Sequence, residues 1–350
     1  MRVAVLLTIG HFILGGGEKM ANDLVYNLKK YGHRARRYDI MFSGTRLNHF
    51  NRGQLSSYMT RLDDVDLVIP LVPVNCSVNH PNVVPWLLGQ GKGIYEFFND
   101  EQHGFGNYGG EGKVIRDLTI AAESASLQKL PRVYTISPRV KELLKKYNNV
   151  DSEVLVLPIE KDGDFFCKEY GDFVFYHSRF LSQKRQHLAV EAMRYTKTPV
   201  KLVVAGADNH TDYVNRIRNF IDTHDLKDKV QLLVGYFTHE QKINWLSTCL
   251  GGFYLGEDED YWAITTTEVM LSKKPVIAPT DTGATKYVVK DGVTGFQPEG
   301  TPQAVAEAID KLYLDKKAAK RMGEEGYELI NKISPSLETV VRTLTGEAWL

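Results

Sequence analysis

Three features are scarce in this sequence of 350 residues: cysteine, long hydrophobic runs and an excess of charge of either sign. The three cysteines, Cys76, Cys167 and Cys249, lie far apart and form no C-x-x-C spacing. So few, scattered thiols are typical of a reducing compartment and give neither a disulfide framework nor a cysteine zinc site. We therefore expect a cytoplasmic protein.

No segment approaches the roughly 18 consecutive apolar residues that indicate a membrane-spanning helix. The apolar N-terminus, residues 1–10, is too short for a span and lacks a signal-peptide cleavage pattern, which favours a buried strand. The 43 basic and 43 acidic residues cancel to a formal net charge of +0. The chain thus has no overall field toward nucleic acid or an anionic membrane. Nucleic acid is a disfavoured partner, and peripheral contact with a membrane through local patches stays open.

Buried-strand patterns alternate with helical patterns along the chain, which is typical of βαβ units and parallel sheets. In the first half we expect strands at 2–8, 66–72, 93–98, 133–136 and 154–157, and helices at 18–31 and 138–147. The pattern then restarts with strands at 173–177, 200–205, 230–233 and 275–278, and helices at 186–194, 213–224, 239–249, 264–272 and 302–314. The length is too great for one compact core, so we predict two doubly wound α/β domains.

The most informative segment is residues 256–279, GEDEDYWAITTTEVMLSKKPVIAP. Asp260 lies between an apolar run at 252–255 and a predicted helix at 264–272. Glu268 follows eight positions later, within that helix. Unpaired N–H groups at the start of a helix favour phosphate, and carboxylates make strong hydrogen bonds with sugar hydroxyls. The segment therefore predicts a site for a sugar joined to a phosphate.

A second segment, residues 175–185, places Arg179 and Lys184 in a loop after a predicted strand. Fixed cations stabilise a leaving group that gains negative charge in the transition state. Taken alone, this motif also fits a loop of ordinary surface charges. A third segment, Gly15-Gly16-Gly17-Glu18, would let the backbone approach a phosphate, or simply form a flexible turn. It is not a G-x-G-x-x-G nicotinamide fingerprint.

Together these motifs resemble those of the retaining glycosyltransferases of family 4. Asp260-x7-Glu268 stands where that family has Glu-x7-Glu, Val269-Met270 stands where it has Ala-Met, and Pro275-Val-Ile-Ala278 matches its Pro-Val-Ile strand. The loop with Arg179 and Lys184 is similar to the family's Gly-Arg-Leu-x-x-x-Lys-Gly stretch. The first acid is Asp rather than Glu, so its side chain is one methylene shorter.

The resemblance implies a GT-B fold, in which two Rossmann-like doubly wound parallel-sheet domains face each other across a cleft. Residues 1–158 would form the acceptor-side domain, with 334–350 crossing back onto it, and 159–333 the donor-binding domain. The implied reaction, in class EC 2.4, moves a hexosyl or pentosyl group from a UDP-, GDP- or ADP-sugar to a hydroxyl acceptor with retention. The acceptor stays open: a saccharide or a lipid-linked compound is one option, and a small molecule, a protein or a nucleic acid is another.

Family roles carry over to matching residues. Asp260, Arg179 and Lys184 are the expected catalytic residues. The resemblance assigns donor binding to a further set: Glu268, Gly16, Gly17, Tyr236, Phe237, Ala263, Ile264 and Thr265. Asn99 and His103 are expected on the acceptor side. No cofactor and no metal are implied, although Asp258-Glu259-Asp260 matches a metal-binding D-x-D of another glycosyltransferase class.

Some alternatives stay open at this point. The glycine-rich residues 104–112 fit either a mobile acceptor loop or a long surface loop. The basic cluster Lys29, Lys30, Arg34, Arg36 and Arg37 fits a solvated helix end or a membrane-facing helix. For the whole chain, the rival functions are a nucleotide-sugar epimerase of the same fold and a non-catalytic nucleotide-sugar-binding protein.

Overall fold

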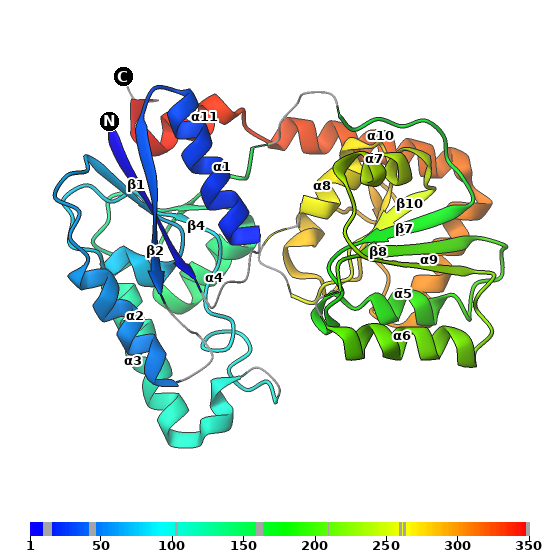
Figure 1. Ribbon diagram of the computed structural model, residues 1–350, viewed down its shortest axis with the longest axis horizontal. Helices are drawn as coiled ribbons and strands as arrows, with labels where there is room; N and C mark the ends of the chain where they lie inside the picture. Colours follow the sequence, from blue (N-terminus) through cyan, green and yellow to red (C-terminus); the bar gives the residue numbers. More distant parts are fainter. Residues whose placement is uncertain are drawn as a thin grey trace. The chain divides into compact units, whose positions relative to one another are not determined.

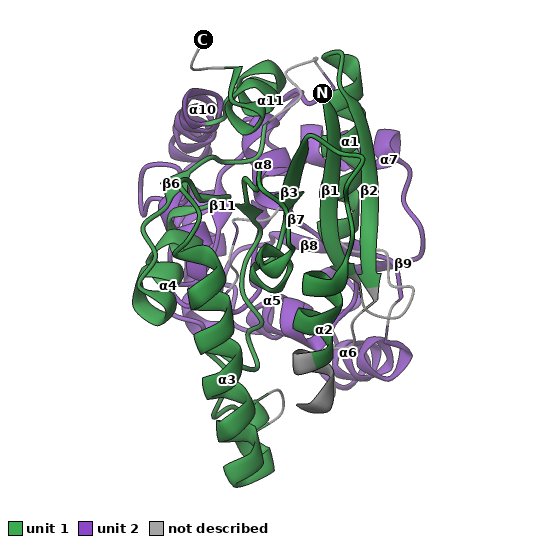
Figure 2. Ribbon diagram, turned by 90° about the vertical axis from the view of Figure 1, so that its left-hand side faces the viewer, with its two compact units in different colours: residues 1–160, 334–350 green, residues 161–333 purple. Residues whose placement is uncertain are grey.

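The computed structural model describes residues 1–350 apart from 10–15, 42–46, 102–103, 159–163, 209, 259–260, 262–263 and 348–350. It divides into two compact units, coloured separately in Figure 2. Unit 1 comprises Met1–Glu160 and Ser334–Leu350, and unit 2 comprises Lys161–Ile333. The boundaries expected from the sequence were 158/159 and 333/334.

Unit 1 contains two three-stranded parallel sheets, ordered β2-β1-β3 and β4-β5-β6. The strands are β1 Arg2–Ile9, β2 Arg34–Met41, β3 Leu67–Pro70, β4 Trp86–Leu87, β5 Tyr134–Thr135 and β6 Glu153–Val154. The sheets adjoin at β3 and β4, because the Val84 and Leu88 N–H groups donate to the carbonyls of Val68 and Leu71 at 3.0 and 2.9 Å. The strand order reverses direction between β1 and β3, which makes their carboxyl ends a switch point.

The helices of unit 1 cover this sheet system. They are α1 Gly16–Lys30, α2 Leu47–Met59, α3 Gly109–Leu127, α4 Pro138–Asn148 and α11 Leu337–Thr345, with short 3-10 helices η1 Pro73–Ser77 and η2 Phe105–Tyr108. α4 starts as the sequence predicts, with Pro138 in its first turn and the Ser137 hydroxyl accepting from the Val140 N–H at 3.2 Å. α11 contacts α1, so the chain returns to unit 1 after completing unit 2 (Figure 1).

Unit 2 is built on one six-stranded parallel sheet with the order β12-β11-β10-β7-β8-β9. The strands are β7 Phe173–His177, β8 Lys201–Gly206, β9 Val230–Val234, β10 Gly251–Phe253, β11 Val276–Ile277 and β12 Gly295–Phe296. The helices are η3 Ser182–Lys184, α5 Gln186–Ala192, α6 Thr211–Thr223, α7 His239–Thr248, α8 Ile264–Leu271, η4 Gly283–Tyr287, α9 Pro302–Leu314 and α10 Lys316–Ile333. The strand order reverses between β7 and β10.

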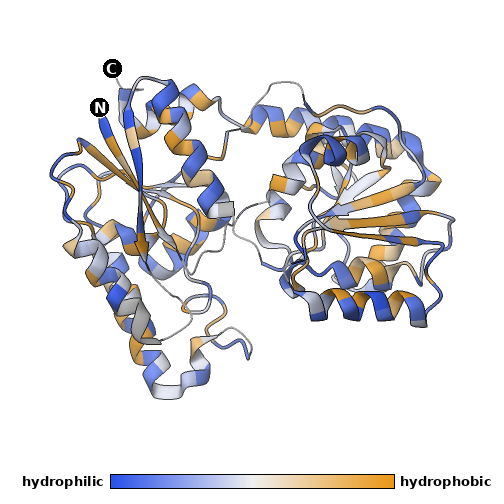
Figure 3. Ribbon diagram, in the orientation of Figure 1, coloured by the Kyte–Doolittle hydropathy of each residue, from blue (hydrophilic) through white to orange (hydrophobic). Residues whose placement is uncertain are grey.

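Apolar strands account for the core of unit 2. β7 and β8 are nearly continuous hydrophobic runs, as expected of parallel strands that helices cover on both faces (Figure 3). Val174, Tyr176, Leu202 and Val204 are fully buried in one cluster with residues of α5, α6 and α9. A Cβ added at Gly252 would lie 2.4 Å from Val269 Cγ2, so the glycine lets α8 pack directly on β10.

Two expectations for unit 1 named the wrong kind of secondary structure. Residues 92–99 form consecutive turns rather than a strand at 93–98, because the Ile94 and Tyr95 N–H groups both donate to the Gly91 carbonyl. The strand in this region is β4 instead. Likewise, Arg34, Arg36 and Arg37 belong to β2 at the edge of its sheet, not to a helix end. Exposed charges suit an edge strand, since they discourage pairing with another chain.

The glycine-rich run is also more regular than expected. Apart from the undescribed residues nearby, 105–108 form η2 and 109–112 form the first turn of α3. A Cβ at Gly112 would lie 2.0 Å from the Phe105 carbonyl oxygen. This glycine therefore serves a close backbone contact, and the expectation of a long loop over 104–112 is wrong.

Candidate functional site

The loops after β7 and β10 meet at the switch point of unit 2. The first loop carries Arg179 and Lys184, and the second begins at Tyr254, directly after β10. The Lys184 ammonium donates to the Tyr254 hydroxyl at 3.2 Å, and it lies 5.4 Å from the centre of the same ring. In open α/β sheets, ligands bind at the carboxyl ends of the strands beside this point.

Arg185 fixes the relative position of these loops. Its guanidinium makes two hydrogen bonds of 2.7 Å with the Asp281 carboxylate and a third, of 2.5 Å, with the Leu255 carbonyl. The hydrogen bonds from Arg185 hold the pKa of the Asp281 carboxyl below its usual range. The buried Gln186 donates its side-chain N–H to the Arg179 carbonyl at 2.8 Å. The backbone around Arg179 is thereby preorganised.

The Arg179 side chain differs from that of Arg185. It is half-buried, and its guanidinium has no hydrogen bond or ion pair with any described residue. A cation held on a fixed backbone but not neutralised by a carboxylate is available to an anionic ligand. The structure thus brings Arg179 and Lys184, the two cations that the sequence selected, into one loop at the switch point.

Glu268 lies on α8 and forms an ion pair with Lys242 on α7. Their side chains are only 12% and 15% exposed. Nearby, His177 ends β7; its burial, reinforced by the positive charge of Lys242, lowers the pKa of its imidazole to about 4. His177 is therefore neutral at pH 7.

Other predicted donor residues are grouped around His177. The Thr265 hydroxyl donates to the His177 carbonyl at 3.4 Å, and the Phe237 ring stands edge-on to the imidazole with 6.3 Å between centroids. Tyr236 follows β9 and is 88% exposed, and Ile264 is an exposed residue that begins α8. Asp260, Ala263 and His103 lie outside the described residues, so their predicted roles stay predictions.

The sequence reasoning missed four contributors: Tyr254, His177, Lys242 and the Arg185–Asp281 pair. Tyr254 and His177 could have been found, because each stands at the carboxyl end of a predicted strand. Lys242 and Asp281 carry no such signal, since they meet their partners only through tertiary contacts over 26 and 96 residues.

The structure describes three of the predicted residues of unit 1. Gly16 and Gly17 begin α1, and a Cβ at Gly17 would meet Leu88 Cδ1 at 3.6 Å, an ordinary contact. Asn99 is exposed at the end of the 92–99 turns.

Among the residues that the structure describes, no group of three or more His, Cys, Asp or Glu side chains could hold a metal ion. In the same described part, no helix has the length and apolarity to cross a membrane.

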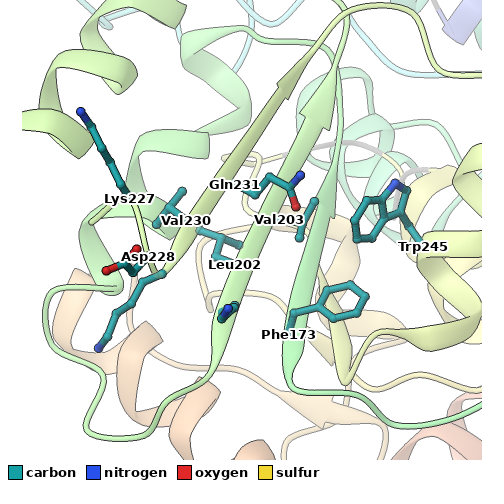
Figure 4. A pocket seen from close by; sticks show the side chains of 10 residues that line it. Phe173, Leu202, Val203, Lys227, Asp228, Val230, Gln231 and Trp245 are labelled. Carbon is teal, nitrogen blue, oxygen red and sulfur yellow. The ribbon is translucent and has the colours of Figure 1, made fainter. Parts of the chain in front are cut away.

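A separate hollow of about 370 Å³ lies at the opposite, amino ends of β7, β8 and β9 (Figure 4). Phe173, Val203, Gln231 and Trp245 line it, together with residues at the starts of β8 and β9. One of its lysines, Lys229, donates to the Thr196 carbonyl and hydroxyl. None of the residues predicted to bind the donor lines this hollow.

Residues 160–329 match a family model described as glycosyl transferases group 1. Two curated relatives are the alpha-1,3/1,6-mannosyltransferases ALG2 of Homo sapiens and Dictyostelium discoideum, each 28% identical to this chain. The matches cover 57% and 42% of this chain, and 53% and 37% of the relatives. The matched region therefore spans about half the length of the human relative and less than half the length of the Dictyostelium relative.

Solved structures resemble the whole chain. The Anabaena protein HepE, crystallised with UDP and glucose, gives a TM-score of 0.73 at 15% identity, with 99% of each chain covered. Sucrose-phosphate synthase from Thermosynechococcus elongatus gives a TM-score of 0.75 at 16% identity, with 99% of this chain and 98% of that chain covered. At such identities, the likeness shows a shared fold.

Proposed function

We propose that the protein transfers a sugar from a nucleotide-diphosphate sugar to a hydroxyl acceptor. The proposal rests on the match of residues 160–329 to the glycosyl transferases group 1 family and on the GT-B fold of the chain. The anomeric configuration of the sugar is retained. The observation that carries the proposal is the contact between Lys184 and Tyr254, which joins the loops after β7 and β10 at the switch point.

The donor's diphosphate binds Arg179 and Lys184. As the bond from the anomeric carbon to the phosphate oxygen breaks, its electron pair leaves with the diphosphate, and the two cations stabilise the added charge. The acceptor hydroxyl oxygen forms the new bond to the same carbon, and its proton passes to an oxygen of the leaving phosphate. Neither a metal nor a cofactor takes part.

The remaining donor contacts follow from the chemistry of each side chain. Glu268 accepts hydrogen bonds from the ribose hydroxyls, and Asp260 does so from the donor sugar. Tyr236 and Phe237 contact the base, Ile264 and Thr265 at the start of α8 face the phosphates, and Ala263 adds to that contact. Gly16 and Gly17 supply a second helix start, and Asn99 and His103 contact the acceptor.

UDP-sugars are the first donors to test. HepE is crystallised with UDP-glucose, and a second structural neighbour, the Staphylococcus aureus protein TarM, with UDP. The ALG2 relatives are mannosyltransferases, which makes mannose the second sugar to test. The acceptor is a saccharide or a lipid-linked hydroxyl compound, and the latter would need peripheral contact with a membrane.

The test begins with thermal shift across UDP-, GDP- and ADP-sugars, because a ligand that binds only the folded state raises its apparent stability. With the donor so identified, Arg179→Ala and Lys184→Ala should each lower turnover by ~10²–10³. Lys201→Ala, at the amino end of β8, is the matched control and should leave turnover unchanged.

Three outcomes would contradict the proposal. Near-normal turnover in both loop variants would remove the diphosphate assignment. If NMR detects release of free sugar or of an epimer in the absence of any acceptor, the protein is an epimerase. Calorimetric binding of the donor without any product across saccharide and lipid-linked acceptors would indicate a non-catalytic binding protein.

A further inference from the structure

An ion pair joins helices α7 and α8 of unit 2. The Lys242 ammonium on α7 pairs with the Glu268 carboxylate on α8 (Figure 1). Because both side chains are mostly buried, water and salt screen the pair less than an exposed one. The two helices follow different strands, β9 and β10, so the pair links two segments near the carboxyl ends of the sheet.

The backbone on each side of the pair is held in place. α7 begins with a capping box, in which the Thr238 hydroxyl accepts from the Gln241 N–H at 3.2 Å and the Gln241 side-chain oxygen accepts from the Thr238 N–H at 3.0 Å. Lys242 follows directly, and its N–H donates to the Thr238 carbonyl at 3.1 Å. On α8, Val269 follows Glu268 and packs against β10. With both backbones fixed, the ion pair sets where the carboxylate lies.

The surroundings of Lys242 show how far its charge acts. The ammonium lies 5.8 Å from the centre of the Phe165 ring. Burial and, to a smaller extent, the charge of Lys242 lower the pKa of the His177 imidazole at the end of β7. The same charge that keeps His177 neutral therefore matches the negative charge of Glu268.

A mostly buried carboxylate keeps its charge and its direction only with a partner. Without the cation, Glu268 would take up a proton or turn toward water, because burial penalises the ionised form. Lys242 bonds one of its oxygens, Oε1. A carboxylate has about four acceptor positions, so the paired Glu268 retains capacity for two hydroxyl donors. Two neighbouring hydroxyls of a ribose fit that capacity.

We propose that Lys242 is a positioning residue, which holds the Glu268 carboxylate for the ribose hydroxyls and thereby makes the site select ribonucleotides over 2′-deoxyribonucleotides. The proposal rests on the proposed function, in which Glu268 accepts from the ribose of the donor. Lys242 acts through Glu268 and needs no contact with the donor. A site built to bond a hydroxyl discriminates against an analogue that lacks it, because the bond to the charged acceptor is then lost.

The readout is a ratio of two dissociation constants, measured by calorimetry on the full chain. The probes are UDP, GDP and ADP, each with its 2′-deoxy counterpart, and the base that binds wild type most tightly is used. Wild type should prefer the ribonucleotide by about tenfold or more, as expected for a hydrogen bond to a charged group. Lys242→Met should lower that preference to about threefold or less. Lys242→Arg, which keeps a cation, should retain it.

The ratio separates positioning from a purely structural role. A loss of folded protein weakens the binding of both nucleotides alike and cancels in the ratio. Arg179→Ala, at the diphosphate, should also weaken both and leave the ratio unchanged. The matched lysine control is Lys316→Met, which removes an ion pair with Asp172 and a contact with the Tyr313 ring elsewhere in unit 2. It should change neither affinity.

A double variant tests whether Lys242 acts through Glu268. Glu268→Gln removes the charged acceptor and should lower the ratio as Lys242→Met does. Combining the two substitutions should then add no further loss, because residues that act as one unit are not additive. A further fall in the ratio of the double variant would show that Lys242 acts on the nucleotide by another route, which would overturn the proposal.

Other results would also overturn it. An unchanged ratio in Lys242→Met would show that Glu268 needs no cation to bind the ribose, and a higher ratio would show that Lys242 competes with the ribose for the carboxylate. A wild type that binds both nucleotides equally would remove ribose selection. Binding of none of the three nucleotides would end the proposed function together with this inference. Selection that depends on Lys242, without sugar transfer to any acceptor, would support the inference and contradict the transferase alone.

Discussion

The candidate site of unit 2 and the interior of unit 1 use buried charge in different ways. In unit 2, two cations near the carboxyl ends of the strands pair with carboxylates from other elements, Arg185 with Asp281 and Lys242 with Glu268. In unit 1, Arg139 pairs with Glu96, but the buried Glu123 has the Tyr95 hydroxyl as its hydrogen-bond partner instead of a cation. The ion pairs of unit 2 join the loops and helices of the candidate site, whereas the hydrogen bond of Glu123 joins α3 to the turns at residues 92–99.

Close backbone contacts occur in both units. In unit 2, β8 touches the loop after β7 so closely that a Cβ at Gly206 would lie 1.9 Å from the Ser178 carbonyl oxygen. In unit 1, a Cβ at Gly112 would lie 2.0 Å from the Phe105 carbonyl oxygen, whereas a Cβ at the nearby Gly110 would meet nothing within 4 Å. We infer that the cost of a substitution depends on the local backbone contact rather than on the unit.

The largest expected effect is that of Gly206→Ala. The new methyl group must displace the backbone next to Arg179, so we expect unit 2 to lose more than about 3 kcal/mol of unfolding free energy. Urea denaturation and donor affinity measure the consequences. Gly110→Ala is the matched substitution in unit 1 and should be neutral or stabilising by about 1 kcal/mol. Equal effects of the two substitutions would mean that the close backbone contact at Gly206 does not set the cost.

The second prediction concerns pH. Burial raises the pKa of the Glu123 carboxyl to about 7, above its unfolded value of 4.5. The folded state therefore binds more protons between these values, and stability falls as pH rises from about 4.5 through about 7, by about 3 kcal/mol in total. Neighbouring groups add nothing in that window, because burial raises the pKa values of Tyr95 and Cys76 as well.

Glu123→Gln tests this prediction, because the amide keeps an acceptor for Tyr95 and cannot ionise. The urea midpoint of unit 1 should no longer fall over the pH range in which Glu123 weakens wild type, and it should rise slightly, because burial lowers the pKa of His33 in the same unit. Glu142→Gln, on the exposed side of α4, is the control and should keep the wild-type slope. A Glu123→Gln slope equal to that of wild type would assign the pH dependence to other groups.

Sequence patterns predicted the core of unit 2 well and that of unit 1 less well, for physical reasons. β7 and β8 are long apolar runs, and the structure places β7 at the predicted residues 173–177. In unit 1, β4 has only two residues, α3 buries Gly112, Thr119 and Glu123 besides Leu127, and the buried residues described in α2 are Gly53 and Ser57. Hydrophobic periodicity has no signal for such elements, which explains why both helices were missed.

The candidate site divides along similar lines. The positions of Arg179, Lys184 and Glu268 near predicted strands, together with the resemblance of the surrounding motifs to family 4, were enough to select them. The ion pair of Glu268 with Lys242 depends on how α7 and α8 pack, and no local pattern encodes that contact. The sequence therefore selected the charges of the candidate site but not the charges that pair with them.

A smaller effect is expected from Lys242→Met. This substitution leaves the mostly buried Glu268 carboxylate without its cation and should destabilise unit 2 by about 2 kcal/mol. Adding Glu268→Gln should restore part of the loss, which a double-mutant cycle measures by urea denaturation. In unit 1, Lys19→Met removes the exposed Lys19–Asp23 pair and should cause no measurable loss. Strict additivity in the cycle would mean that Lys242 does not hold Glu268.

The smallest effects on stability are expected from removing one helix cap in each unit. The Ser137 hydroxyl caps α4 in unit 1 and the Thr301 hydroxyl caps α9 in unit 2, each accepting from the backbone N–H three residues on. Ser137→Ala and Thr301→Ala should each cost about 1 kcal/mol, because one N–H loses its partner. Amide hydrogen exchange should show faster opening of α4 alone in the first variant and of α9 alone in the second. Faster exchange throughout both units in either variant would show that they unfold together, and the contrast between them would then not extend to their stability.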